Sequence, residues 1–109
     1  MIVNLAAILR ESKRCEDFLA RWFMGDEFLL VLPGTALSDA RRVAERMRKK
    51  VRTISRKWEI PITISIGIAC YPENGESLSQ LLISAQQACF AAKEWGRNCT
   101  VSADELSER

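Results

Sequence analysis

Two adjacent carboxylates, Asp26 and Glu27, are the residues of this chain whose types and spacing best suit chemistry. They follow Gly25 and lie between two apolar runs, 18–23 and 27–32, which predict the strands of a β-hairpin. Carboxylate oxygens are the ligands that Mg²⁺ prefers, and Mg²⁺ also binds substrate phosphates. The spacing therefore predicts a metal site at the hairpin tip, although Gly-Asp is also an ordinary hairpin turn that needs no metal.

Two cations, Lys93 and Arg97, form a second candidate site near the end of the last long helical pattern. A spacing of four residues would place both on one face of a helix, where their charges can hold phosphate groups. Cations near a helix C-terminus are also favourable without a ligand, because they interact with the helix dipole. Phosphate binding and plain helix stabilisation both stay open from these residues alone.

The pattern of apolar, polar and turn residues predicts the elements that position these side chains. The predicted elements are, in chain order, a helix over 2–13, strands over 18–23 and 27–32, a long helix capped by Ser38, a strand over 62–69, a helix from Ser77 or Ser79 to Gly96, and a short edge strand over 98–101. Residues 104–109 are expected to be a frayed polar tail. The order α-β-β-α-β-α, with a last β, indicates an α/β fold.

The two long helices each have an apolar face that predicts burial. In the first, apolar residues recur every three or four positions, at Ala40, Val43, Ala44, Met47, Val51 and Ile54. In the second, the inward positions are Leu78, Leu81, Leu82, Ala85, Ala88, Cys89, Ala92 and Trp95. Gly67, in the strand between the two helices, leaves room for a backbone or a ligand to come close.

Composition limits the class of protein. With 109 residues, 48% of them hydrophobic, the chain can bury one core. Residues 41–57 hold nine of the 16 basic residues and one acid, so the first long helix has a basic face. A basic face is usually solvated, but binding to nucleic acid or an acidic membrane is a further hypothesis.

The four cysteines, Cys15, Cys70, Cys89 and Cys99, lack C-x-x-C spacing, and the chain has no histidine to complete a zinc site. We expect reduced, mostly buried thiols in a cytoplasmic protein. The apolar start lacks the basic n-region of a signal peptide, and no run has the roughly 18 apolar residues of a membrane span.

Three blocks of this sequence resemble, in order, the motifs of GGDEF domains, the diguanylate cyclases. Residues 24–28 read Met-Gly-Asp-Glu-Phe, where the family has Gly-Gly-Asp/Glu-Glu-Phe. Residues 61–72 resemble its T-[IV]-S-[IV]-G strand, and residues 81–98 its closing A-K-x-x-G-R-N helix. The resemblance covers nearly the whole chain.

The resemblance implies a palm-like α/β sandwich, shared with nucleotidyl cyclases and polymerases, that joins two GTP molecules into cyclic di-GMP with Mg²⁺ across a two-fold dimer. By this resemblance Asp26 and Glu27 are metal ligands and catalytic residues. The same family motifs imply substrate contacts and an inhibitory product site; the substrate contacts are Gly25, Lys93 and Arg97, and the product site is Arg14, Asp17 and Arg46.

The sequence also departs from the family pattern. Met24 replaces the first signature glycine, whose missing side chain lets the backbone approach the nucleotide. Trp22 and Phe23 stand where the family has one aromatic residue, so a bulge near Phe23 and Met24 or a different turn is expected. Gln86 and Phe90 replace the usual aspartate and tyrosine.

The family's first third, with a first helix and a central strand that bears another metal-binding aspartate, has no counterpart among these residues. We therefore expect residues 1–109 to be one partial GGDEF domain with half of the metal site and little turnover. The alternative is a degenerate module that binds cyclic di-GMP or pairs with an intact cyclase. The free edge of strand 62–69 is expected to promote dimerisation or to leave the chain marginally stable.

Overall fold

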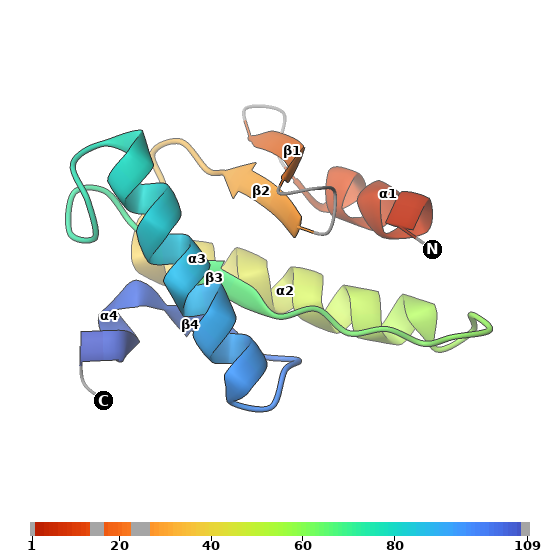
Figure 1. The fold of residues 1–109 in the computed structure, drawn as a ribbon. Helices are drawn as coiled ribbons and strands as arrows, with labels where there is room; N and C mark the ends of the chain where they lie inside the picture. The colour runs from red at the N-terminus through yellow and green to blue at the C-terminus, as the bar shows by residue number, and fades with distance from the viewer. Residues whose placement is uncertain (1, 14–16, 23–26, 108–109) are drawn as a thin grey trace. The chain divides into compact units, whose positions relative to one another are not determined.

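The computed structural model describes residues 2–13, 17–22 and 27–107, which form two compact units, residues 1–35 and 36–109 (Figure 1). The first unit contains the helix α1 (Ile2–Ser12) and the strands β1 (Phe18–Trp22) and β2 (Glu27–Val31). The second contains, in chain order, α2 (Leu37–Ser55), β3 (Ile66–Ile68), α3 (Leu78–Glu94), β4 (Thr100–Ser102) and α4 (Ala103–Ser107). The predicted order of helices and strands is confirmed, and α4 is added to it.

The hairpin of the first unit pairs β1 with β2 in an antiparallel ladder that runs from Phe18 opposite Val31 to Trp22 opposite Glu27. Every residue of one strand faces one residue of the other, so the ladder has no bulge between these pairs. The bulge or altered turn expected near Phe23 and Met24 lies outside the described residues. Pro33 and Gly34 follow the hairpin, and Gly34 has the left-handed φ of 61° that favours glycine.

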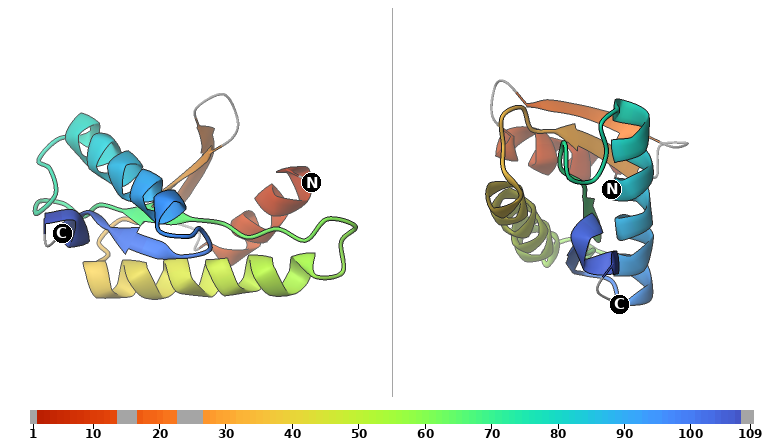
Figure 2. Two further views of the ribbon diagram at one scale, coloured as in Figure 1. Left: turned by 60° about the horizontal axis from the view of Figure 1, so that its bottom comes forward. Right: turned by 90° about the vertical axis from the view of Figure 1, so that its left-hand side faces the viewer.

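The second unit is an α/β sandwich built on two parallel strands. β3 pairs with β4 from Ile66 opposite Thr100 to Ile68 opposite Ser102, and α3 connects the two strands. Figure 2 shows α2 on one side of these strands and α3 on the other. The predicted α/β class is thus confirmed, with a core of Ala88, Ala91, Ala92 and Val101 between α3 and the strands.

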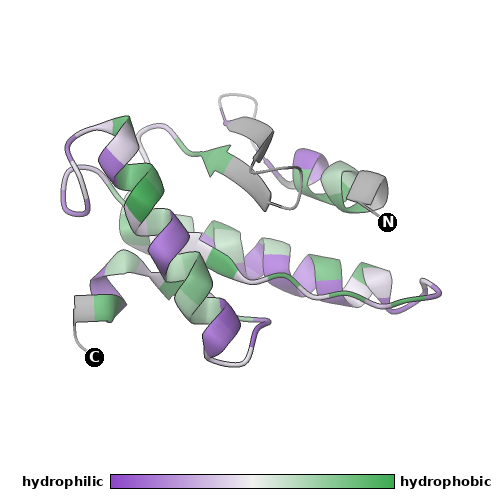
Figure 3. Cartoon of the chain, in the orientation of Figure 1, coloured by the Kyte–Doolittle hydropathy of each residue, from purple (hydrophilic) through white to green (hydrophobic). Residues whose placement is uncertain are grey.

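Helix α2 buries one stripe, as its sequence predicts, and exposes a hydrophilic face (Figure 3). Ala40, Ala44, Met47 and Val51 are buried, whereas Ile54, predicted to be buried, is 39% exposed. Ser55 takes the place of Ile54 because it lies four residues after Val51 on the same stripe, and it is 0% exposed. The predicted cap was wrong too: the helix begins after Ala36, without a side-chain cap, and Ser38 lies in its first turn.

Ser55, at the end of α2, forms hydrogen bonds with Ile62 in the segment that leads into β3. Its hydroxyl donates to the carbonyl of Ile62 at 2.9 Å and accepts from the amide N–H of Ile62 at 3.0 Å. Both backbone groups of Ile62 are therefore satisfied outside a strand ladder. The predicted strand 62–69 was too long for this reason, since only Ile66–Ile68 pair with β4.

Gly67 lies against the backbone of α3. A Cβ atom at this position would overlap the carbonyl oxygen of Ala85 and the amide nitrogen of Cys89. The expectation that Gly67 permits a close approach is confirmed, and a helix backbone is what approaches. Leu78 and Trp95, predicted to point inward, are 64% and 38% exposed because they occupy the first turn and the C-cap of α3.

The predicted polar tail was wrong, because residues 103–107 form α4. Arg41 of α2 donates to Ser102 Oγ at 3.0 Å and to Glu105 Oε1 at 2.6 Å. Asn74, in the turn before α3, donates to Asp104 Oδ1 at 2.7 Å. These bonds attach the short helix to two distant parts of the unit.

Three cysteines are free thiols, with Cys70 buried and Cys89 and Cys99 partly buried, as the sequence predicts. Burial raises the pKa of Cys70, which favours the neutral thiol. Cys15 lies outside the described residues. Within the described residues, no helix is long and apolar enough to cross a membrane.

Candidate functional site

Glu27 is the first residue of β2 and pairs with Trp22, the last residue of β1. The ladder thus fixes the backbone position of one member of the predicted carboxylate pair. Asp26, Gly25 and Met24 lie outside the described residues. Their roles stay predictions.

The donors of this pair suit Mg²⁺, which commonly takes one or two protein carboxylates and completes its shell with waters and substrate phosphates. In the parts of the chain that are described, no three His, Cys, Asp or Glu side chains gather as a closed metal cage.

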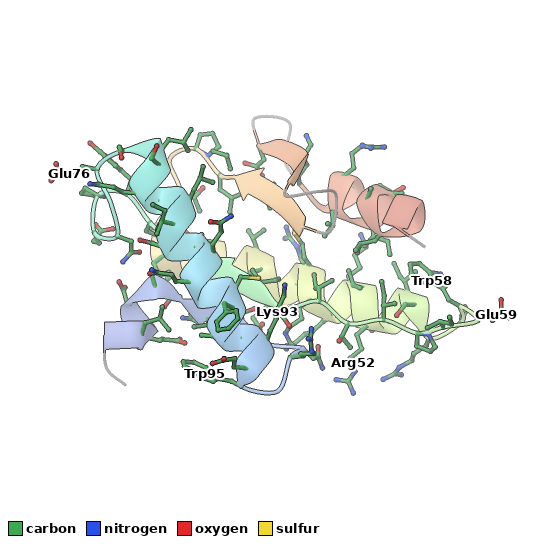
Figure 4. The ribbon with its side chains drawn as sticks, viewed as in Figure 1. Arg52, Trp58, Glu59, Glu76, Lys93 and Trp95 are labelled. Atoms are coloured by element: carbon green, nitrogen blue, oxygen red, sulfur yellow. The ribbon has the colours of Figure 1, made fainter. Side chains whose placement is uncertain are left out.

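The second candidate site lies where α3 ends. The amide of Trp95 makes the last helical bond, to Ala91 O at 2.8 Å, and the amide of Arg97 bonds Ala92 O at 3.0 Å across a six-residue turn. Gly96, with φ of 118°, provides the left-handed stop that the sequence predicts. Lys93 occupies the last turn of α3, and Figure 4 shows it leaving the helix on the side opposite Trp95.

Arg97 is not helical. Its φ is 61° and that of Asn98 is 48°, so both follow the glycine in the left-handed region. The prediction that Lys93 and Arg97 share one helix face was therefore wrong, because the helix stops between them. They remain neighbours at one helix end, and the side chain of Arg97 is exposed.

Asn98 belongs to a hydrogen-bonded cluster of four residues that we call the Asn98 clamp: Glu45, Arg48, Asn98 and Thr100. Arg48 Nη1 donates to the side-chain Oδ1 of Asn98 at 2.9 Å and to its carbonyl at 3.2 Å. Arg48 also donates two parallel hydrogen bonds, of 2.7 and 2.8 Å, to the carboxylate of Glu45. The hydroxyl of Thr100 donates to the same carboxylate at 2.7 Å. The clamp joins α2 to both sides of the turn after α3.

The electrostatics of the clamp favour the charged pair. Hydrogen bonds from Arg48 and Thr100 lower the pKa of Glu45 to about 2, and the bond to Glu45 raises the pKa of Arg48. Arg48 has a side chain only 13% exposed, and it donates four hydrogen bonds to Glu45 and Asn98, so it is a largely buried cation with charge-assisted partners.

Acid is expected to weaken the fold through Glu45. Its folded pKa of about 2 lies below 4.5, so its stabilisation is complete above about pH 4.5 and is lost as the pH falls through about 2. Because the Glu45 side chain is 35% exposed, we expect about 1 to 2 kcal/mol rather than the full value of the shift. Urea unfolding between pH 7 and pH 2.5 should show a flatter pH dependence for Glu45→Gln than for the wild type. The exposed Glu59→Gln is the control, and equal slopes for the wild type and Glu45→Gln would contradict the assignment.

Sequence reasoning missed Glu45 and Arg48 as site residues. The available signal was that Glu45 is the one acid within the basic run 41–57 and stands three residues before Arg48. The three-residue spacing of Glu45 and Arg48 alone indicates an ordinary ion pair on a helix surface. Only the fold reveals that Asn98 and Thr100 are its partners.

The residues of the predicted product site are Arg14 and Asp17 in the first unit and Arg46 in the second. Asp17, just before β1, is 6% exposed. Arg46 lies on the exposed face of α2, and Arg14 lies outside the described residues. This site stays a prediction.

Comparison with protein families gives one result that covers most of the chain. The family described as "Diguanylate cyclase, GGDEF domain" matches residues 1–99. A bifunctional diguanylate cyclase/cyclic di-GMP phosphodiesterase, MucR of Pseudomonas aeruginosa, is 38% identical over 101 residues, which are 90% of this chain and 14% of MucR. The chain therefore spans a small part of such a relative.

Solved structures agree with the sequence comparison. Diguanylate cyclase SiaD of Pseudomonas aeruginosa, solved with its activator SiaC, has a TM-score of 0.82 and 36% identity over 93% of this chain and 39% of that one. The GGDEF domain of DgcB from Caulobacter crescentus, solved with c-di-GMP, has a TM-score of 0.82 and 29% identity over 94% of this chain and 63% of that one.

Proposed function

Because the chain belongs to the GGDEF family of diguanylate cyclase domains, we propose that it binds GTP with Mg²⁺ and takes part in forming cyclic di-GMP. The observation that carries this proposal is the end of α3. There, an exposed arginine follows a glycine stop, with a second cation in the preceding turn. Two cations that lie near one helix end can donate charge-assisted hydrogen bonds to a polyphosphate.

Each residue has a role set by its chemistry. Asp26 and Glu27 hold the metal, and Gly25 lets the loop lie close to the nucleotide. Lys93 and Arg97 bind the β- and γ-phosphates. When bound, Mg²⁺ supplies positive charge that offsets the charge of the phosphates as pyrophosphate leaves.

We propose that these 109 residues, on their own, turn over little GTP. Two-metal catalysis needs carboxylates on both sides of the ions, whereas the hairpin supplies one pair. Met24 adds a flexible side chain where the family has a glycine. Since cyclic di-GMP is built from two GTP molecules, a second copy or a partner GGDEF domain would hold the other nucleotide.

A binding module is the alternative function. Met24 would harm catalysis but would leave Arg14 and Asp17 intact, and the exposed position of Arg46 suits contact with a phosphate. In this case cyclic di-GMP, rather than GTP, is the ligand.

Isothermal titration with GTP, with and without Mg²⁺, tests the proposal. We expect Mg²⁺ to strengthen binding to the wild type, and Glu27→Gln to lose about tenfold or more because a metal ligand is removed. Arg97→Ala should lose a similar factor, whereas the exposed Arg52→Ala, which removes the same charge from α2, should stay within about twofold. The same samples, incubated with GTP and Mg²⁺, are analysed for cyclic di-GMP by chromatography, and little or none is expected.

Three results would redirect the assignment. GTP binding that ignores both Mg²⁺ and Arg97→Ala would contradict the proposed site. Rapid product formation would contradict the low turnover. Binding of cyclic di-GMP that is weakened by Arg46→Ala, together with no binding of GTP, would favour the alternative.

A further inference from the structure

Arg97 is attached to the fold on both sides of its own residue. On its N-terminal side, its amide N–H bonds Ala92 O at 3.0 Å and closes the turn that ends α3. On its C-terminal side, Asn98 receives two bonds from Arg48. The exposed side chain of Arg97 therefore extends from a backbone position that is fixed at both ends.

Such attachment matters because two consecutive residues other than glycine, Arg97 and Asn98, have left-handed φ values of 61° and 48°. L-residues seldom adopt this region, although asparagine does so more readily than arginine, and contacts with the surroundings help to hold a turn made of two such residues. Arg48 supplies the restraint on Asn98, since Nη1 reaches both its carbonyl and its side-chain oxygen.

Arg48 is in turn fixed by Glu45 and Thr100. The two-bond contact with Glu45 sets the plane of the guanidinium, and Thr100, at the start of β4, secures the carboxylate from the far side of the turn. A lysine at position 48 would keep the charge but would lose the planar fork that meets Glu45 and Asn98 together.

We infer that Glu45 and Arg48 are positioning residues for phosphate binding by Arg97, a role that rests on the proposed function. The Asn98 clamp holds the turn in its binding conformation before the ligand arrives. Binding then requires little ordering of the backbone, which lowers its entropic cost. Neither Glu45 nor Arg48 needs to touch the phosphate.

A double-mutant cycle tests this inference in the 109-residue chain, with inorganic tripolyphosphate as the probe in isothermal titration. We expect Arg97→Ala to weaken binding about tenfold and Arg48→Lys about fivefold. Arg52→Lys, the same change at an exposed position one turn along α2, should have an effect below about twofold. In the Arg97→Ala background, Arg48→Lys should cause no further loss, because the arginine that it positions is absent.

A purely structural role would give the opposite result in that background. If Arg48→Lys weakens binding equally with and without Arg97, or leaves the binding of the wild type unchanged, the inference is overturned while the proposed function stands. If the wild type binds no tripolyphosphate and no GTP, the proposed function fails, and the positioning role fails with it.

Backbone NMR provides a second readout that does not depend on the ligand. The couplings between the amide and α protons of Arg97 and Asn98 report their φ angles. We expect Arg48→Lys to shift these couplings away from left-handed values while the remaining amide resonances show a folded chain. Unchanged couplings in a folded variant would overturn the inference.

Discussion

Gly67→Ala is expected to unfold the unit of residues 36–109, or to lower its free energy of unfolding by more than about 3 kcal/mol. The added methyl group would overlap two backbone atoms of α3 and would lie 2.8 Å from Cys89 Cα. Backbone atoms cannot rotate away as a side chain does. The strand and the helix would have to separate, which would open the core of small residues around Ala88 and Ala92.

Thermal and urea unfolding followed by circular dichroism measure this effect. Gly34→Ala is the matched control, because its φ of 61° is left-handed but no atom lies within 4 Å of the added Cβ. It should cost about 1 kcal/mol from backbone strain alone. A Gly67→Ala chain as stable as the control would mean that β3 and α3 are not in direct backbone contact.

Ser55→Ala is expected to destabilise the same unit by about 2 to 4 kcal/mol. One hydroxyl satisfies both the N–H and the carbonyl of Ile62, and Ser55 is 0% exposed. Removing the hydroxyl leaves two backbone groups without these partners where water enters poorly. The segment that leads into β3 would lose its attachment to α2.

The urea midpoint reports this change, and Thr53→Ala is its control because Thr53 is an exposed hydroxyl residue on the same helix. The control should change stability by less than about 0.5 kcal/mol. If Ser55→Ala and Thr53→Ala behave alike, water replaces the missing hydroxyl and the two bonds contribute little.

Periodic apolar residues predicted the helices and the hairpin well, because local patterning decides where a helix or a strand forms. The failures came from partners that are distant in the sequence. The strand 62–69 was shortened because Ser55 takes both backbone groups of Ile62, and no local pattern reveals that bond. The helix at 103–107 was missed because its attachment depends on Arg41 and Asn74.

For the candidate site, too, the sequence predicted residue types but not contacts between residues that are distant in the chain. Family motifs named Glu27, Lys93 and Arg97 as candidates by residue type and order, and their roles stay predictions. The four-residue spacing of Lys93 and Arg97 predicted a shared helix face, which was wrong because Gly96 ends α3 between them. Glu45 and Arg48 went unnoticed because their significance depends on Asn98, which is remote in the chain and adjacent in the fold.

The parallel pairing of β3 with β4 has a consequence for how the unit folds. Ile66 reaches Thr100 only across the whole of α3, so this contact closes a long loop and carries a high entropic cost until that helix has formed. Helix formation should therefore precede sheet formation. A chain released before residue 100 would have α3 but no partner for β3, and it would complete its core only when residues 100–102 arrive.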